Sequence, residues 1–442
     1  MRLGTLAAAI ALAHCRSLPD AASMSQEFVI LGGARTPMAE YSGTPGHGLF
    51  KDLSALELGA IATRAALERT GVEPARVDGA FFGNALQTSN DAIYGARHVA
   101  LKAGLPQETP CLTVNRLCGS GIQSVISACH AIAAGEATVT VAGGMENMSQ
   151  APFVVHGIRT GVRFGVQPKL EDLLFAALYD PYCGFYMAQT ADNVARRYEI
   201  GREAQDELAL RSHQNLAAAY ERGFFDDLMT PYRGVTRDEF LRPDTSLEKL
   251  GKLRTAFSAP GSDNATMTAG NSTPLTDGAS TVLLASEEWA AARGLPALAR
   301  VVDAETAAVD FTGGAEGLLM GGCYAVPRLL DRRGLTLADF DFVEIHEAFA
   351  STVLTTLAAW DDAEFCRERL GREPLGTVDP DRLNVTGSSL AAGHPFGATG
   401  GRIVGTLAKL LAEKKAQTGE PTRGLISVCA AGGQATAMIL EA

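Results

Sequence analysis

The order of predicted elements in the first third of this chain recurs in its last third. Residues 53–70 have the apolar spacing of an amphipathic helix, and a glycine, a short strand and a loop follow it. Residues 324–349 show the same succession. A strand end, tight turn and helix start at residues 114–134 recur at residues 383–411. The alternation predicts a mostly parallel α/β sheet built from two similar βαβ halves, with one reactive turn from each half.

The middle of the chain interrupts this pattern. Residues 151–274 contain charged helices and loops rich in proline, arginine and aspartate, which we interpret as an inserted loop or lid subdomain. The N-terminal half then comprises residues 26–150, completed by residues 275–300, and the C-terminal half comprises residues 301–442. A chain of 442 residues exceeds the size of a single hydrophobic core, so such a division is expected.

Residues 1–25 stand apart from the repeat. They have a basic start and a short apolar run, as in a signal peptide, but the residues around Cys15 make a poor cleavage site. We interpret the segment as a leader or as a start codon assigned too early, with Met24 as the first residue, because the first convincing strand begins at Phe28. The expected location is the cytoplasm, and the mitochondrial matrix is the alternative if the segment is a transit peptide.

The composition narrows the classes of partner. A formal net charge of −12 argues against non-specific binding to nucleic acid or to a membrane surface, although a local basic patch could still bind an anionic ligand. The 8 cysteines show no Cys-x-x-Cys pair and no zinc-like spacing, so no metal site is expected, and free thiols indicate a reducing compartment. No run reaches the roughly 18 apolar residues that a transmembrane helix requires.

The turn at residues 114–121 is the first candidate for chemistry. Cys118 lies between a strand end and a helix of small residues, where unpaired N–H groups and the helix dipole favour the thiolate. Gly119 and Gly121 are expected to leave open the space in front of the sulfur, so that a thioester can approach the backbone. A buried structural cysteine is the alternative, and Cys118 taken alone favours that alternative.

Three further residues lie on equivalent turns and change this balance. They are His346, His394 and Cys429. A histidine can activate a cysteine nucleophile, and His394 precedes a proline inside a glycine cluster, which is a poor place for a core histidine. Taken alone, His346 could simply form a hydrogen bond, and Cys429 could be a small core residue. The combination of the four residues favours cysteine-based catalysis.

These motifs resemble those of the thiolase superfamily. The family's N-x-x-C-G-S-G turn matches residues 115–121, and its H-E-A-F loop matches residues 346–349. Its G-H-P-x-G-A-T-G loop matches residues 393–400, and a C-x-G-G-G-like loop matches residues 429–433. The motifs occur in the family's order over most of the chain. The resemblance implies two repeated halves packed as an α/β/α/β/α sandwich with an inserted loop subdomain.

The resemblance also implies a role for each matching residue. Cys118 would attack the acyl carbonyl, His394 would take the Cys118 proton, and Cys429 would act as the acid/base toward the acetyl-CoA enolate. Backbone N–H groups of Cys118 and Ala431 would form one oxyanion hole, and the side chains of His346 and His394 would form the other. The implied substrate- or CoA-binding residues are Met187, Arg242, Thr273, Ala348 and Phe349. No bound cofactor or metal is implied, because coenzyme A arrives as a substrate.

Three departures from the commonest family pattern stand out. His346 replaces an asparagine, as in the branch that resembles the β-subunits of fatty-acid-oxidation multienzymes, and an imidazole can change its charge near neutral pH. Ala430 and Ala431 replace part of the glycine loop, and Thr273 stands where many members carry serine.

The activity implied is cleavage of a 3-ketoacyl-CoA by CoA to acetyl-CoA and a shortened acyl-CoA, as in fatty-acid β-oxidation. The expected partners are acyl-CoA, CoA and further copies of the chain in a homodimer or homotetramer, and a hydratase/dehydrogenase subunit is a further candidate. One alternative is an acetoacetyl-CoA thiolase that runs toward condensation. A decarboxylating ketoacyl synthase of similar fold is another, against which Cys429 argues, and a non-enzymatic lipid carrier is the third.

Overall fold

The computed structural model describes residues 27–256, 265–312 and 316–442. The expectations for residues 1–25 therefore lie outside the described residues. No helix in the described ranges is long and apolar enough to cross a membrane.

One large sheet runs through the molecule, in the order β12-β13-β14-β11-β1-β10-β5-β3-β4, with β2 paired to β10. The strands of the first half are β1 (Phe28–Arg35), β2 (Ala39–Glu40), β3 (Gly79–Gly83), β4 (Cys111–Val114), β5 (Val139–Glu146) and β10 (Thr276–Ser286). Those of the second half are β11 (Ala299–Ala308), β12 (Phe342–Ile345), β13 (Arg423–Ala430) and β14 (Gln434–Glu441). Pairing of β1 with β11, from Phe28 opposite Val301 to Ile30 opposite Ala299, joins the halves.

The expectation of a mostly parallel sheet is wrong. Among the described strands of the large sheet, β3 runs parallel to β4 and β5, and β12 runs parallel to β13, whereas the other neighbours are antiparallel. Residues 431–433 alone connect β13 to β14. A parallel connection needs a crossover of a dozen or more residues, so this short link requires an antiparallel pair.

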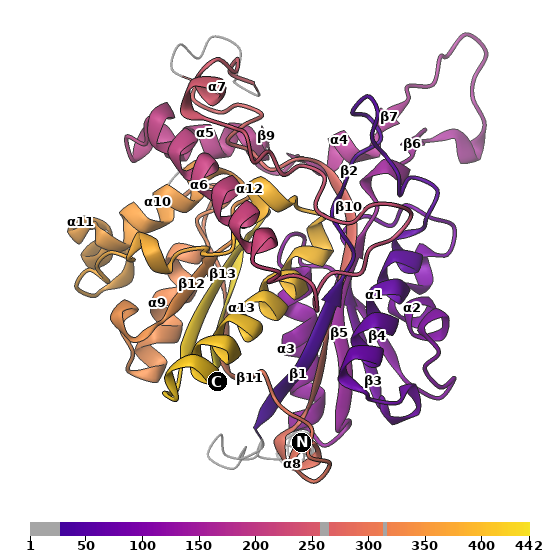
Figure 1. Ribbon diagram of the computed structural model, residues 1–442. Coiled ribbons are helices and arrows are strands. Elements are labelled where there is room, and N and C mark those ends of the chain that lie inside the picture. The colour runs from indigo at the N-terminus through magenta and orange to yellow at the C-terminus, as the bar shows by residue number, and fades with distance from the viewer. Residues whose placement is uncertain (1–26, 257–264, 313–315) are drawn as a thin grey trace, which may run out of the picture.

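The α/β fold with two repeated halves is confirmed. Helices α3 and α13 lie between the two halves of the sheet, α1 and α2 cover the outer face of the first half, and α9 and α10 cover that of the second (Figure 1). These layers give the expected α/β/α/β/α sandwich. The bounds of these helices are α1 (Ala55–Thr70), α2 (Ala96–Ala103), α3 (Ser120–Ala133), α9 (Gly322–Arg333), α10 (Ala350–Asp361) and α13 (Phe396–Thr418).

Local sequence signals set the helix ends. The Ser54 hydroxyl accepts a hydrogen bond from the Glu57 N–H, and the Glu57 carboxylate accepts one from the Ser54 N–H, which is a complete capping box at the start of α1. Gly71 ends the helix at φ 67°, in the left-handed conformation that glycine adopts without strain. The expected helix at residues 53–70 therefore forms almost as the sequence indicates.

The segment between β5 and β10 adds no described strand to the large sheet. Its small pairs are β6 (Phe153–Val154) with β7 (Glu171–Asp172), and β8 (Tyr179–Asp180) with β9 (Phe185–Tyr186). Its helices are α4 (Leu173–Ala177), α5 (Met187–Arg197), α6 (Arg202–Glu221) and α7 (Leu247–Gly251). The short helices elsewhere are α8 (Glu287–Ala291), α11 (Ala363–Phe365) and α12 (Ser389–Ala392). An inserted subdomain at residues 151–274 remains a prediction, with which this arrangement agrees.

Candidate active site

The N-terminal turns of α3 and α13 meet at the centre of the molecule. Their backbones approach so closely that a Cβ atom added at Gly121 would lie 2.6 Å from the carbonyl oxygen of Gly397. Only glycine permits this contact. The expectation that Gly121 keeps space open for a thioester is therefore wrong. Gly121 instead brings the turn that carries Cys118 against the turn that carries His394.

A strained, hydrogen-bonded turn holds Cys118 directly before α3. Leu117 adopts a φ of 50°, which is uncommon for a residue with a side chain. The Asn115 side-chain oxygen accepts a hydrogen bond from the Leu117 N–H at 2.9 Å. The Ser120 hydroxyl donates to the Leu117 carbonyl at 2.6 Å and accepts from the Arg116 N–H at 2.8 Å. These bonds fix the backbone that presents the sulfur.

The surroundings of Cys118 favour the thiol over the thiolate in the free protein. The residue as a whole is only half-buried, but enough protein surrounds the sulfur that burial raises the pKa of the thiol to about 12. The N–H groups of Ala431 and of Cys118 itself lower this pKa, and the nearby Glu146 carboxylate raises it. The expectation that the helix N-terminus favours the thiolate is wrong, because loss of solvation outweighs it.

His346 and His394 lie side by side, with ring centroids 4.2 Å apart. Each ring is held through its Nδ1 atom. His394 contacts the Thr399 hydroxyl at 2.6 Å, and His346 contacts the Ser389 hydroxyl at 2.9 Å. The Nε2 atom of each ring is buried and has no hydrogen-bond partner among the described residues. Unpaired buried nitrogens are costly, so both are available to a group that enters the site.

Both imidazoles are neutral at physiological pH. Burial, with a smaller effect of Arg402, lowers the pKa of His394 to about 3. Burial also lowers the pKa of His346 well below its usual value, and His394 and Arg402 act in the same direction. The expected change of His346 charge near neutral pH is therefore wrong.

Cys429 lies at the end of β13 in an apolar cluster. Burial raises the pKa of its thiol, and the nearby Cys118 adds to this effect. The buried members of the cluster are Met187, Ala191, Met267, Leu318, Leu319, Ala348 and Cys429, and the partly buried ones are Cys183, Phe311, Phe349 and Ala431. The structure thus places Met187, Ala348 and Phe349, three of the predicted binding residues, in one cluster with Cys429.

Thr273 and Arg242, the two remaining candidates for substrate binding, differ in their surroundings. The Thr273 N–H donates to the Ala348 carbonyl at 3.1 Å, which places Thr273 next to the Cys429 cluster. Arg242 contacts the Glu40 carboxylate at 3.2 Å and lies over the Phe240 ring. Its charge is already balanced, so the structure gives no support to a phosphate contact at Arg242.

Sequence reasoning missed a buried carboxylate beside these turns. Glu146, the last residue of β5, accepts hydrogen bonds from the N–H groups of Ala85, Leu86 and Gly397 and from the Asn84 side chain. Burial raises the pKa of Glu146 to about 7. Glu146 ties the loop after β3 to the start of α13. The available signal was a glutamate at the end of an apolar strand, two residues after Gly144.

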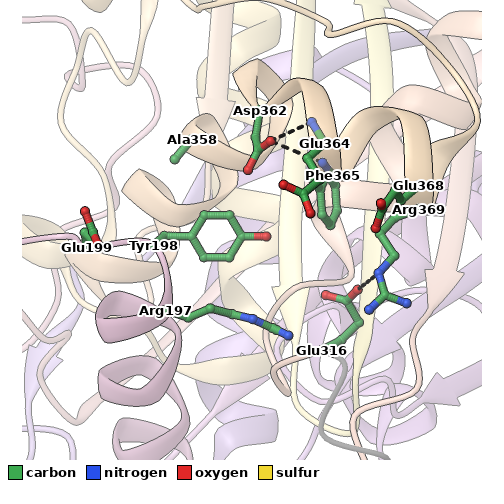
Figure 2. Close-up of a pocket in the computed structure, with 10 residues that line it drawn as sticks. All are labelled: Arg197, Tyr198, Glu199, Glu316, Ala358, Asp362, Glu364, Phe365, Glu368 and Arg369. Carbon is green, nitrogen blue, oxygen red and sulfur yellow. Dashed lines mark hydrogen bonds and ion pairs between the residues drawn. The ribbon is translucent and has the colours of Figure 1, made fainter.

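Two cavities flank the C-terminal half. One, of about 470 Å³, is lined by acidic side chains and two arginines, and Arg369 contacts Glu316 at its wall (Figure 2). No predicted site residue lines it. The other, of about 260 Å³, shares Cys183, Phe311 and Leu318 with the Cys429 cluster. In the described ranges no group of three or more His, Cys, Asp or Glu side chains could hold a metal ion.

Two repeated halves that bring a cysteine turn to a histidine pair define an acyl-transferring enzyme, and the chain belongs to the thiolase family. The family model described as "Thiolase, N-terminal domain" matches residues 28–288, and the model "Thiolase, C-terminal domain" matches residues 295–442.

Individual relatives agree with this assignment. The chain is 39% identical over 422 residues to "3-ketoacyl-CoA thiolase, mitochondrial" of Homo sapiens. This alignment covers 93% of the present chain and 97% of the relative. It is also 39% identical over 421 residues to "Acetyl-CoA acetyltransferase" of Rhizobium meliloti. This second alignment covers 93% of the present chain and 98% of the relative. The crystal structure of human mitochondrial 3-ketoacyl-CoA thiolase in complex with CoA superposes with a TM-score of 0.82 at 38% identity, covering 94% and 98% of the two chains.

Proposed function

We propose that this protein is a 3-ketoacyl-CoA thiolase, which cleaves a 3-ketoacyl-CoA with CoA to acetyl-CoA and a shortened acyl-CoA in fatty-acid β-oxidation. The observation that carries the proposal is the meeting of the Cys118 turn with two buried imidazoles whose Nε2 atoms are unpaired. The 3-ketoacyl-CoA thiolase relatives support the choice of substrate.

The first step transfers the acyl group to Cys118. Because the resting side chain is a thiol, attack on the carbonyl requires a base, and His394 supplies it through Nε2. The contact of His394 Nδ1 with the Thr399 hydroxyl orients the ring, and burial keeps it neutral and able to accept the proton. Backbone N–H groups of Cys118 and Ala431 stabilise the negative oxygen that develops on the carbonyl.

The second step stabilises and protonates the enolate of acetyl-CoA. Arg402 can only donate, so the Ser389 hydroxyl accepts from it at 2.7 Å. This favours donation of the Ser389 proton to Nδ1 of His346, which leaves the ring proton on Nε2. His346 then donates from Nε2 to the enolate oxygen together with His394. As the carbon–carbon bond of the substrate breaks, Cys429 gives its proton to the enolate carbon, or it removes the α-proton in the reverse direction. The thiol of CoA then attacks the acyl group on Cys118 and gives its proton to the Cys429 thiolate. The shortened acyl-CoA leaves, and the Cys118 thiolate regains its proton from His394.

The apolar cluster around Cys429 is suited to the pantetheine and acyl parts of the substrate. We assign Met187, Thr273, Ala348 and Phe349 to this channel, with the adjoining cavity of about 260 Å³ as space for the acyl chain. Arg242 would have to leave Glu40 to contact a phosphate. CoA is a substrate in this scheme, and no bound cofactor takes part in it.

The second candidate is an acetoacetyl-CoA thiolase that runs toward condensation, which the acetyl-CoA acetyltransferase relative favours. Rates of thiolysis on a series of 3-ketoacyl-CoA lengths distinguish the two. We expect faster cleavage of longer chains than of acetoacetyl-CoA. The highest rate on acetoacetyl-CoA, with little reaction of longer chains, would instead support the second candidate.

We further propose a homodimer or homotetramer in the cytoplasm, with the mitochondrial matrix as the alternative that the mitochondrial relatives support. The edge strand β4 supports self-association, because Leu112 is 47% exposed there and edge strands invite pairing. Light scattering on the purified protein measures the assembly. A hydratase/dehydrogenase subunit is a possible further partner, tested by co-purification from the source cells.

A further inference from the structure

The cavity of about 470 Å³ in the C-terminal half lies apart from the reactive turns. Its walls come from the end of α5, the end of α10 and the short helix α11 with the turn that follows it (Figure 2). We call it the acidic cavity. None of the side chains assigned to catalysis or to substrate binding lines it, so the proposed reaction does not explain its composition.

One buried carboxylate oxygen in the acidic cavity lacks a hydrogen bond. Glu316 is only 8% exposed. Its Oε1 atom accepts a hydrogen bond from the Tyr324 hydroxyl at 2.5 Å and lies 3.8 Å from Nε of Arg369. Its Oε2 atom has no hydrogen-bond partner among the described residues, and Figure 2 shows the carboxylate directed into the cavity. An unpaired buried carboxylate oxygen is costly, so this site favours a ligand that brings a hydrogen-bond donor.

The acidic cavity carries an excess of negative charge. Its described lining includes five carboxylates and two guanidinium groups, those of Arg197 and Arg369, which leaves a formal net charge of −3. The carboxylates are those of Glu199, Glu316, Asp362, Glu364 and Glu368. A recess lined mainly by one sign of charge concentrates ligands of the opposite sign. The donor that Glu316 lacks is therefore expected to belong to a cation.

The carboxylates are spread along the cavity rather than gathered around one point. In Figure 2, Glu199 lies on one side of the Tyr198 ring, and Glu364 and Glu368 lie on the other. Within the described ranges, no three His, Cys, Asp or Glu side chains are grouped so that they could hold a metal ion. The spread instead matches a ligand with more than one positive group. The rings of Tyr198 and Phe365 offer apolar and cation-binding faces to such a ligand.

We propose that the acidic cavity binds an aliphatic polyamine, in which short methylene chains separate the ammonium groups. One ammonium group donates to Oε2 of Glu316, and another lies near Glu199. The methylene chain between them packs on Tyr198. A basic side chain of a partner protein would bring a single cation and leave the carboxylates on the other side of the ring unpaired, so the distribution of charge favours the free polyamine.

Isothermal titration calorimetry of the full chain with spermidine tests the proposal. We expect one site per chain and weaker binding as the concentration of NaCl rises. Glu316→Gln should weaken binding by about 10–100-fold, because it removes the charge from a buried hydrogen bond. Glu364→Gln/Glu368→Gln changes only exposed carboxylates, which leaves the fold intact, and should weaken binding by about 2–10-fold.

The matched control for charge is Glu68→Gln/Glu73→Gln, which removes two exposed carboxylates from the first half of the chain. This variant should bind spermidine as the wild type does. Urea denaturation of each variant verifies that it is folded. If Glu316→Gln does not fold, the Glu364/Glu368 variant decides the outcome against this control.

The spacing of the charges is tested with 1-aminobutane, which presents a single cation. It should bind at least about tenfold more weakly than spermidine, because it leaves the carboxylates on one side of the cavity unpaired. Equal affinity for the two amines would assign the cavity to a single basic side chain of a partner protein and overturn the proposal. It is also overturned if spermidine shows no saturable binding, or if both cavity variants bind spermidine as tightly as the control.

Discussion

Burial sets the protonation of the reactive side chains. It makes Cys118 a thiol and keeps His346 and His394 neutral, so the site starts without any charge on these three groups. In the proposed reaction, protons then move between neighbouring atoms rather than to solvent. Replacing one reactive group should therefore affect one step of the reaction and leave the others measurable.

Cys118→Ser should abolish acyl transfer. A serine hydroxyl has a far higher pKa than a thiol, and the neutral His394 is too weak a base for it, so we expect a loss of at least about 10³-fold. Mass spectrometry after mixing with acetyl-CoA should show an acetyl adduct on the wild type only. Cys111→Ser, another half-buried free cysteine, is the matched control and should keep the adduct. An adduct that survives Cys118→Ser would remove Cys118 from the nucleophile role.

Cys429→Ala should separate the two chemical steps. The acetyl-enzyme should still form on Cys118, whereas making and breaking of the carbon–carbon bond should slow by roughly 10²–10⁴-fold, the usual loss for a general acid/base. Single-turnover acetylation and full thiolysis, measured on the same protein, give the two numbers. If both fell equally, Cys429 would be a packing residue of its apolar cluster.

His346→Asn should retain part of the activity without changing the pH profile between about 6 and 8. The pKa of His346 lies well below that range, so the ring does not titrate there. An asparagine keeps a donor near the enolate but does not reach as far. Rates of thiolysis against pH for the two proteins provide the measurement. A profile that flattens in the variant would show that His346 gains its proton near neutral pH.

At the level of elements, turns could be predicted from the sequence better than strands. The Cys118 and His394 turns combine glycines with reactive residues in a fixed spacing, which is visible in the sequence alone. The sequences of strands β10, β11 and β14 contain no comparable motif. Their antiparallel pairing is set by contacts with strands that are distant in the sequence. The contacts of Glu146 could not be predicted, because three of its partners are the backbone N–H groups of Ala85, Leu86 and Gly397, which are distant in the sequence.

Gly121→Ala should destabilise the contact of α3 with α13. The added Cβ would lie 2.6 Å from the Gly397 oxygen and 2.8 Å from the Gly400 nitrogen, so backbone must move. We expect a loss of about 1–3 kcal/mol in the free energy of unfolding, together with reduced activity as the two turns separate. Urea denaturation and thiolysis rates measure these effects.

Gly405→Ala, in the contacting helix α13, is the matched control. Its added Cβ would find only Val282, at an ordinary 3.6 Å. Alanine is the better helix former, so stability should stay unchanged or rise by up to about 1 kcal/mol. Equal losses in the Gly121 and Gly405 variants would mean that helix propensity, and not the close contact, controls both sites.

At the scale of the whole molecule, one buried ion pair ties the segment between β5 and β10 to the central sheet. Arg35 on β1 donates to both carboxylate oxygens of Asp238, at 2.6 and 2.8 Å. The Tyr220 hydroxyl and the Met38 N–H donate to the same carboxylate. This network anchors the segment that contains Met187 against the sheet that carries Cys118.

Asp238→Asn should destabilise the whole protein by about 3–5 kcal/mol, because it leaves the Arg35 charge buried without a partner. Glu248→Gln, in an exposed ion pair with Lys252, is the control and should cost less than about 1 kcal/mol. Chemical denaturation followed by circular dichroism gives both values. A similar small loss in the two variants would show that solvent reaches Arg35.

The register of the two halves carries a consequence for ancestry. Gly83 lies opposite Gly144, and Ile345 lies opposite Ser427. Counting onward from these pairs, Asn84 corresponds to His346, and Glu146 corresponds to Cys429. In the first half this pair is an amide and a carboxylate, which hold the seam between the halves together. In the second half it is an imidazole and a thiol, to which we assign proton transfer. Equal spacing at matching positions is what duplication of one ancestral unit would leave, with one copy of the pair free to change while the other keeps the joint closed.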